Sequence, residues 1–135
     1  MSLFRVKYLS FFFILISVFS FLNIIYSYYF NLYLNLNTYY FSLLPSLIIG
    51  LFFYKIKEIN KKPTIFEKIL TVFLGYVLIP IILSLPLYFS IYNLTFINSL
   101  FESVSGFTST GFTIFDNIKH IDQSLILWRS SIQWI

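Results

Sequence analysis

The residues of this chain whose types and spacing could do chemistry lie together at Thr108-Ser109-Thr110-Gly111. A cation that leaves water must have its hydration shell replaced, and rings of backbone carbonyls can replace it. This requires an extended backbone whose carbonyls are turned inward. Small hydroxyl side chains can fix such a segment, while a glycine supplies backbone dihedrals that other residues resist. The four residues therefore predict one strand of a cation selectivity filter within residues 108–113. A Ser/Thr/Gly-rich outer loop between two helices is the alternative that these residues alone leave open.

The residues just before this stretch predict the helix that would position it. Phe96, Leu100, Val104 and Phe107 fall near one face at helical spacing. Such a helix is ~16 Å long, about half of a bilayer's hydrocarbon core. A half-length helix followed by Thr, Ser and Gly residues suits a re-entrant loop, and its partially negative C-terminal end would point at the ion path. We therefore expect a pore helix at 96–107, which favours the filter over the outer loop.

Charged residues near this stretch are candidates for supporting it. Glu102 lies within the expected short helix, where an ionisable group is costly unless it has a role; it could support the filter through its field or brace the loop by hydrogen bonding. Asp116 and Asp122 could concentrate cations at the outer mouth, or could be solvated loop charges. Arg129 could repel or gate cations, snorkel, or pair with a carboxylate. His120, the single histidine, has no ligand cluster around it, so we expect no metal site there.

The composition places these residues in a membrane protein. Of the 135 residues, 59% are hydrophobic and 10% are charged, against about 25% charged in a soluble domain. A soluble fold of this size could not bury so much apolar surface. The absence of cysteine excludes disulfides, a thiolate metal site and a Cys nucleophile. The sequence holds no nucleotide loop, acid–base pair or nucleophile constellation, so we expect neither an enzyme nor a bound cofactor.

Hydrophobic runs predict the elements that carry the stretch. Transmembrane helices are expected at 8–30, 39–54 and 65–91, and the start of a further helix at 122–135. The first run could also be a signal peptide, but it is too long and lacks a cleavage site. Pro80 and Pro86 predict a kink or an early end of the third helix. The expected fold is thus an all-α integral membrane protein, with transmembrane helices, one re-entrant pore helix and a filter loop.

The basic residues predict the orientation in the membrane. The formal net charge is +4, and most Lys and Arg residues lie near the N-terminus or at 55–68, whereas the break at 31–38 is uncharged. The positive-inside rule then puts the N-terminus and the 55–68 loop in the cytoplasm. The third helix would leave the membrane on the outer side near Asn93. These charges are interpreted as topology determinants rather than as a nucleic-acid surface.

At this point the sequence resembles a known family. From Phe101 to Thr113 it reads FESVSGFTSTGFT, which resembles the first pore segment of TrkH-type potassium transporters, F-E-S-x-S-G-x-T-T-T-G. Leu85-Pro86 resembles the outer end of that family's first pore-domain helix. Leu127-x-Arg129-x-x-x-Gln133-Trp134 resembles the start of the helix after the filter. The resemblance is close over 65–135, whereas over 1–60 the match is one of layout, with two extra helices as in TrkH rather than in Ktr-type subunits.

The resemblance implies which residues form the filter and which ion passes. The filter would comprise Thr108, Ser109, Thr110, Gly111 and Phe112, with K⁺ as the transported ion held by the backbone carbonyls of the first four. Ser109 stands where Thr is usual and keeps the hydroxyl, while Phe112 is bulkier than the common Ala. Relatives with Ser in place of the filter glycine tend to admit sodium, so Gly111 favours potassium.

The resemblance also implies an assembly. The Trk/Ktr/HKT superfamily has four helix–pore loop–helix units in one chain, forms homodimers in the plasma (inner) membrane and uses a cytoplasmic nucleotide-binding regulatory subunit. This chain would then hold two N-terminal transmembrane helices at 1–60 and the first pore unit at 61–135. The last helix would have about fourteen residues, from Asp122 to Ile135, where roughly twenty are needed to span, so we expect the N-terminal piece of a longer transporter. The alternatives are a small membrane subunit or a scaffold without transport activity of its own.

Overall fold

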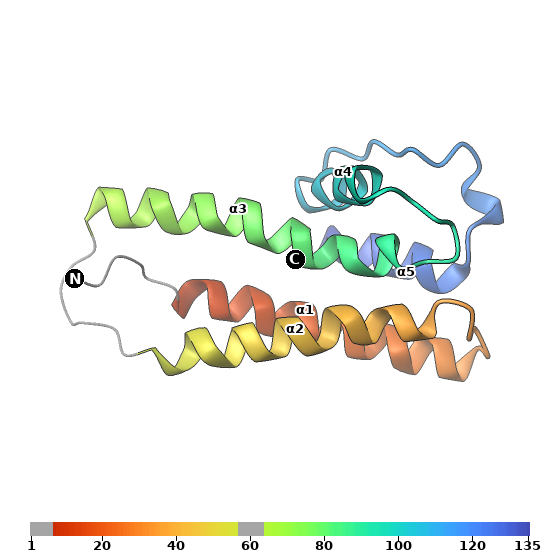
Figure 1. Cartoon of the computed structure of the whole chain (residues 1–135), viewed down its shortest axis with the longest axis horizontal. Coiled ribbons are helices and arrows are strands. Elements are labelled where there is room, and N and C mark those ends of the chain that lie inside the picture. Colours follow the sequence, from red (N-terminus) through yellow and green to blue (C-terminus); the bar gives the residue numbers. More distant parts are fainter. Residues whose placement is uncertain (1–6, 57–63) are drawn as a thin grey trace.

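The computed structural model describes residues 7–56 and 64–135, and within these ranges the regular structure is helical, with no strand. The helices are α1 (Lys7–Tyr29), α2 (Leu36–Lys55), α3 (Ile65–Tyr88), α4 (Phe96–Phe107), the 3₁₀ turn η1 (Ile118–His120) and α5 (Gln123–Ile132) (Figure 1). The predicted all-α fold class is therefore confirmed.

Three of these helices are long and apolar enough to cross a membrane. α1 has 23 residues, α2 has 20 and α3 has 24, and each carries a strongly hydrophobic window. At 1.5 Å per residue they are roughly 30–36 Å long, which matches the hydrocarbon core of a bilayer. The protein is accordingly a multi-pass membrane protein.

The helix ends differ from the predicted ones by a few residues. α2 begins at Leu36 because the backbone N–H and the hydroxyl of Thr38 both donate to the carbonyl of Asn35, at 3.0 and 2.6 Å. α3 ends at Tyr88 rather than 91, and Asn93 then adopts a positive φ of 48° in the turn that follows. α3 continues through Pro80 and ends two residues after Pro86, so the second of the two prolines predicts its end.

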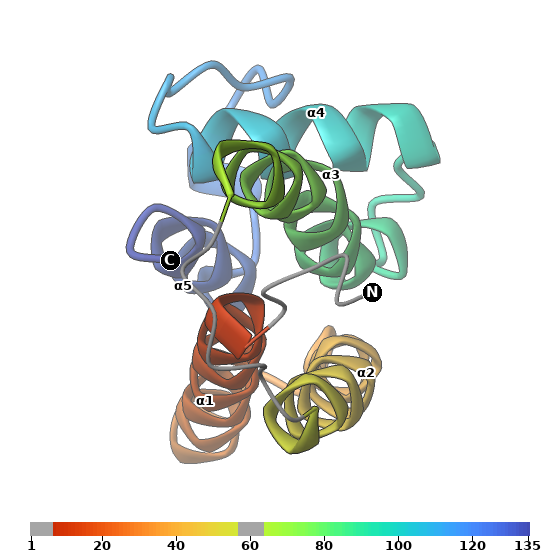
Figure 2. The ribbon, with the colours of Figure 1, turned by 90° about the vertical axis from the view of Figure 1, so that its left-hand side faces the viewer.

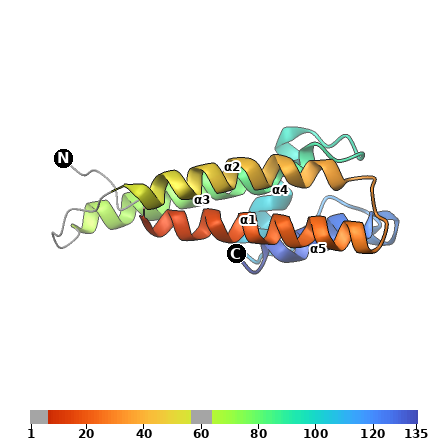
Figure 3. The same ribbon diagram turned by 90° about the horizontal axis from the view of Figure 1, so that it is seen from below.

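Helices α1 and α2 form an antiparallel hairpin and lie side by side (Figure 3). Small residues let the two backbones approach closely, as is common between membrane helices. A Cβ added at Gly50 would lie 3.2 Å from the backbone nitrogen of Ile14. The hydroxyls of Ser20 and Ser42 share a buried hydrogen bond of 2.9 Å across this contact.

The bundle has two distinct ends. One end holds Lys7, Lys55 and the start of α3. The other end, called the Asn35 end below, is where the turn between α1 and α2, the segment after α3 and the start of α5 meet (Figures 1 and 3). Four basic residues of the predicted topology signal lie outside the described residues: Arg5, Lys57, Lys61 and Lys62. The expected boundary between 60 and 61 lies outside them as well.

The C-terminal third of the chain folds back onto this bundle. α4 is seen nearly end-on in Figure 1 and from the side in Figure 2, so it lies across the long axis of α3. α5 packs against α1, α3 and α4. Its Trp128 is fully buried and donates from Nε1 to the carbonyl of Leu83 at 3.1 Å. This anchors α5 in the core and fixes one side of the loop described next.

Candidate ion-binding loop

The contacts of α4 place its C-terminal end beside the middle of α3. Phe96, at the start of α4, packs against Tyr88, with ring centroids 6.0 Å apart. Ser103 donates from Oγ to the carbonyl of Pro80 at 2.9 Å. Phe107, at the end of α4, packs against Tyr76 at 5.5 Å. The partners thus move back along α3 as α4 advances, so α4 ends about half-way along a helix that is long enough to span a bilayer.

After this point the chain returns to the end from which α4 set out. The ring of Phe115 packs against that of Tyr92, which lies in the segment before α4, with centroids 6.2 Å apart. The hydroxyl of Tyr92 accepts from the backbone N–H of Asp122 at 2.6 Å and donates to the carbonyl of His120 at 3.3 Å. Both limbs of the segment therefore meet at the Asn35 end, which is the geometry of a re-entrant loop.

The first residues of the loop close the helix rather than run as an extended strand. Ser109 has a φ of 54°, and its N–H donates to the carbonyl of Gly106 at 2.9 Å. The N–H of Thr110 donates to the carbonyl of Ser105 at 2.9 Å. These two bonds, with a left-handed residue between them, form a Schellman cap, in which glycine is usual at the position that Ser109 holds. The extended backbone expected from the sequence is thus replaced by a tight turn at 108–110.

The backbone N–H groups and carbonyls of the loop lie in different environments. The N–H groups of Thr108, Ser109, Thr110 and Gly111 all donate to carbonyls of α4. Within residues 7–56 and 64–135, the carbonyls of these four residues accept no hydrogen bond, and all four residues are exposed. φ is negative at Thr108 and positive at Ser109 and Gly111. The loop therefore presents free carbonyl oxygens, with its donors turned inward.

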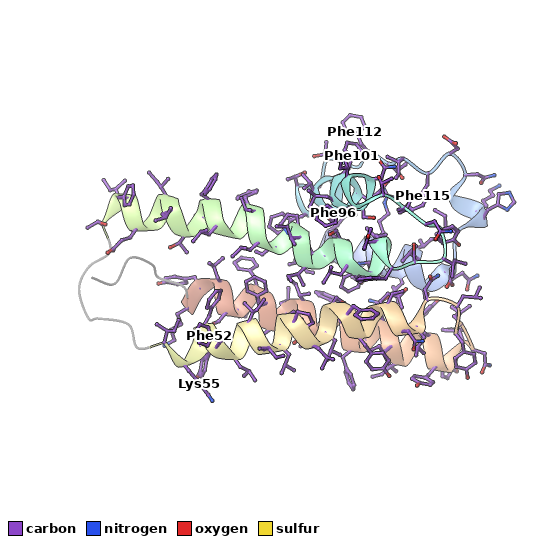
Figure 4. All side chains as sticks on the ribbon, viewed as in Figure 1. Phe52, Lys55, Phe96, Phe101, Phe112 and Phe115 are labelled. Carbon is purple, nitrogen blue, oxygen red and sulfur yellow. The ribbon has the colours of Figure 1, made fainter. Side chains whose placement is uncertain are left out.

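Phe112 differs from the four residues before it. Its carbonyl accepts from Ser105 Oγ at 2.7 Å and from Arg129 Nη2 at 3.2 Å. Its side chain is 66% exposed and points away from the bundle (Figure 4). The free carbonyls thus end at Gly111, and Phe112 offers a ring rather than an oxygen.

Glu102 ties the returning limb of the loop to α4 and α5. It is fully buried, and its Oε1 accepts from the hydroxyl of Thr113 at 2.7 Å and from the N–H of Ile114 at 2.6 Å. Its Oε2 accepts from Arg129 Nε at 2.7 Å in a salt bridge. Arg129 is therefore paired with a carboxylate and holds the loop through Phe112, and Glu102 is the centre of this brace.

The other charged candidates lie apart from the free carbonyls. Asp116 is exposed on the returning limb, and among the described residues no hydrogen bond or ion pair joins its side chain to the brace. Asp122 has a structural role instead of being a solvated loop charge: it caps α5 by accepting from Ser124 N–H at 3.1 Å, and it accepts from Asn35 Nδ2 at 2.8 Å. His120 lies at the Asn35 end, and the described part of the chain holds no cluster of His, Asp and Glu that could bind a metal.

Sequence reasoning did not single out Ser105, Thr113 or Asn35, although all three hold the loop or its supports. A signal was present in α4, whose pattern is inverted. Its fully buried residues are small or ionisable, namely Ser99, Glu102, Ser103, Ser105 and Gly106. Most of its apolar side chains are exposed, namely Phe96, Ile97, Phe101 and Val104. A polar face turned inward indicates hydrogen bonds to the loop and to α5.

Comparison with known proteins identifies three transport proteins as relatives. An uncharacterized cation transporter of Methanocaldococcus jannaschii is 30% identical over 107 residues, covering 78% of this chain and 23% of the relative. The Trk system potassium uptake protein TrkG of Escherichia coli is 39% identical over 61 residues, covering 44% of this chain and 13% of TrkG. TrkI of Halomonas elongata, also a Trk system potassium uptake protein, is 42% identical over 62 residues, covering 46% and 13%.

These relatives confirm the resemblance to TrkH-type potassium transporters. The chain spans less than a quarter of the length of each of the three. No protein-family profile matches it, and no solved structure matches it significantly.

Proposed function

We propose that this chain supplies one pore segment of a Trk-type potassium uptake system, with the carbonyls of Thr108, Ser109, Thr110 and Gly111 facing the ion. The observation that carries the proposal is that the loop turns its backbone N–H groups toward α4 and leaves its carbonyl oxygens exposed. Four successive N–H groups donate to carbonyls of α4, and the carbonyls of the same four residues accept no hydrogen bond from the described part of the chain. A loop of this polarity favours cations over anions and can replace water ligands one by one.

The position of the loop supports the same function. α4 ends beside the middle of α3, so its C-terminal end, with a partial negative charge, lies at the depth where an ion has lost most of its water. The α4 carbonyls that point the same way are already engaged by the Schellman bonds, which holds the turn rigid. A rigid ring of weak oxygen ligands binds a cation and still releases it, which transport requires.

The remainder of the transport path would come from other parts of the whole protein. One loop offers one side of a ring, and the Trk relatives are several times longer than this chain. We propose four such units in one polypeptide, a homodimer in the plasma membrane, and a cytoplasmic nucleotide-binding regulator. The Asn35 end would face outward and the Lys7 end the cytoplasm, in accord with the positive-inside rule.

Growth of a potassium-uptake-deficient strain at low potassium tests the proposal. The gene that encodes this chain, at its full length, is expressed as wild type, as Gly111→Ser and as Asn117→Ser. Asn117 is an exposed residue of the same segment, so it controls for a new serine outside the free carbonyls. We expect growth with the wild type and the control, and increased inhibition by sodium with Gly111→Ser.

The space around Gly111 makes this test specific. A Cβ added there meets no atom within 4 Å, and φ is +82°. A serine therefore acts through the backbone conformation that sets the carbonyls, not through a steric clash. Wild-type protein that is present in the membrane and restores no growth would indicate a subunit or scaffold without transport activity. Gly111→Ser that matches the wild type at equal abundance would count against the carbonyl assignment.

A further inference from the structure

Asn35 is the residue that joins the α1–α2 hairpin to the pore unit. It is fully buried at the Asn35 end of the bundle. Its Nδ2 donates to Asp122 Oδ2 at 2.8 Å, and its Oδ1 accepts from the backbone N–H of Ile91 at 3.1 Å. One side chain thus connects the start of α2, the segment after α3 and the start of α5.

The use of this side chain is unusual for its position. Asn35 is the N-cap residue of α2, and asparagine there normally accepts from a backbone N–H of its own helix. Here the side chain makes no capping bond. The N–H of Thr38, a usual target of such a cap, donates to the backbone carbonyl of Asn35 instead, while the side-chain amide makes two bonds to other elements. A residue type suited to a local role is therefore engaged in a tertiary one.

Both bonds act on elements that hold the ion-binding loop. Asp122 is the N-cap of α5, and Arg129 follows it by two helical turns, so the position of Asp122 sets where the guanidinium meets Glu102. Ile91 lies in the short segment between α3 and α4, five residues before Phe96. Asn35 therefore fixes the two points from which Glu102 on α4 and Arg129 on α5 approach each other.

A second contact runs beside the first and strengthens the coupling. The hydroxyl of Tyr39, one turn further along α2, donates to Ser124 Oγ at 2.8 Å, and Ser124 Oγ donates to Asp122 Oδ2 at 3.0 Å. Tyr39 is fully buried against Trp128, with ring centroids 5.9 Å apart. The first turn of α2 thus contacts the first two turns of α5 through polar and aromatic groups.

We propose that Asn35 is a positioning residue for ion discrimination: it sets the separation of α4 and α5 at which the Glu102–Arg129 brace holds the loop carbonyls. This inference rests on the proposed function. It makes the α1–α2 hairpin a working part of the pore unit rather than a separate membrane anchor.

An exchange of the two polar partners tests this. In Asn35→Asp two carboxylates face each other, while Asp122→Asn keeps a capping oxygen. With both substitutions together, an amide at 122 can donate to a carboxylate at 35, and that carboxylate can still accept from Ile91. The measurement is potassium uptake with sodium as competitor, at matched membrane abundance, in the full-length protein.

We expect potassium-over-sodium discrimination to fall about tenfold in Asn35→Asp, since a hydrogen bond to a charged group is lost, and to return close to the wild-type value in the exchange. Asn35→Ala, which removes both bonds without adding a charge, should lower discrimination as well. Asn37→Asp, an exposed asparagine two residues further on, is the matched control and should leave it unchanged.

The outcomes separate this inference from the proposed function. If the wild type takes up no potassium, the proposed function fails. If the wild type does so and Asn35→Ala at normal abundance discriminates equally well, the positioning role fails alone. The positioning role would also be overturned if the double variant, Asn35→Asp with Asp122→Asn, discriminates between potassium and sodium no better than Asn35→Asp alone. If Asn35→Asp does not accumulate, Asn35→Ala still decides the outcome.

Discussion

The buried carboxylate of Glu102 gives the most exacting test of how the loop is held. Glutamine has the same shape, so Glu102→Gln changes charge and donor pattern with little change in volume. The amide oxygen can take the place of Oε1 and keep the bonds from Thr113 and Ile114. The amide NH₂ then replaces Oε2 and faces Arg129 Nε, which is also a donor. The loop contacts survive in principle, while the ion pair becomes a repulsive contact.

The size of the effect follows from the burial of the pair. Removing one partner of a buried ion pair costs about 3–5 kcal/mol, because the other charge is left uncompensated. Glu102 is fully buried, but the Arg129 side chain is 19% exposed and keeps some contact with solvent. The lower end, about 3 kcal/mol, is therefore the better estimate. A loss of that size reduces the population of the braced loop by about two orders of magnitude.

Arg129→Gln and the double variant complete the test. Arg129→Gln leaves Glu102 without its cation, but Thr113 and Ile114 still donate to the carboxylate. The braced loop should therefore lose less free energy in Arg129→Gln than in Glu102→Gln. With glutamine at both positions, one amide can donate to the other, and no buried charge remains. We expect an interaction energy between positions 102 and 129 of at least about 1 kcal/mol in the double-mutant cycle. The double variant should therefore be destabilised less than the sum of the two single effects.

The assay is sodium competition with potassium uptake, read beside the thermal midpoint of the purified full-length protein. Glu102→Gln should lose discrimination even in samples whose membrane abundance equals that of the wild type. Wild-type discrimination in Glu102→Gln would refute the brace, and so would single effects that add up in the double variant.

Three further predictions concern the glycines and the cap. A Cβ at Gly106 would lie 2.8 Å from Ile132 Cγ2, so Gly106→Ala should cost about 1–3 kcal/mol through overpacking; Ile132→Ala in the same chain should recover part of the lost thermal midpoint. Ser109→Gly should raise that midpoint, because relief of a left-handed non-glycine residue is worth roughly 1 kcal/mol, and no rise would contradict the Schellman cap. Gly111→Ala should impair discrimination as much as Gly111→Ser, because both strain φ and neither clashes; a far milder alanine variant would point to side-chain chemistry instead.

The long helices and the short one were predictable from the sequence for a simple reason. Uncharged apolar runs of membrane length leave few alternatives to a spanning helix, and α1, α2 and α3 lie where such runs lie. α4 occupies Phe96–Phe107, the range that the sequence predicted, since Thr95 can cap its start and the Thr/Ser/Gly stretch ends it. Local sequence signals therefore suffice for the elements of this fold.

The contacts that hold the loop were not predictable in the same way. Glu102 and Arg129 are 27 positions apart, and Asn35 and Asp122 are 87 apart. Each of these residues has a plausible local role, such as snorkelling for Arg129 or capping for Asn35. The choice between a local and a tertiary partner depends on how α2, α4 and α5 converge, and no spacing in the chain encodes that convergence. The expectation of an extended strand failed similarly, because Ser109 adopts a conformation that serine rarely does.

In the proposed function, the brace also determines what kind of attraction the loop offers to an ion. Because the carboxylate of Glu102 is neutralised by Arg129, the pair adds little net charge beside the free carbonyls, and the attraction comes from peptide dipoles. The two single glutamine variants disturb this balance with opposite signs. Glu102→Gln leaves a cation next to the carbonyl of Phe112, which should weaken potassium binding, whereas Arg129→Gln leaves an anion, which should tighten binding and slow release. Potassium half-saturation should therefore move in opposite directions in the two variants; a shift in the same direction would mean that Glu102 and Arg129 act on the loop through packing alone.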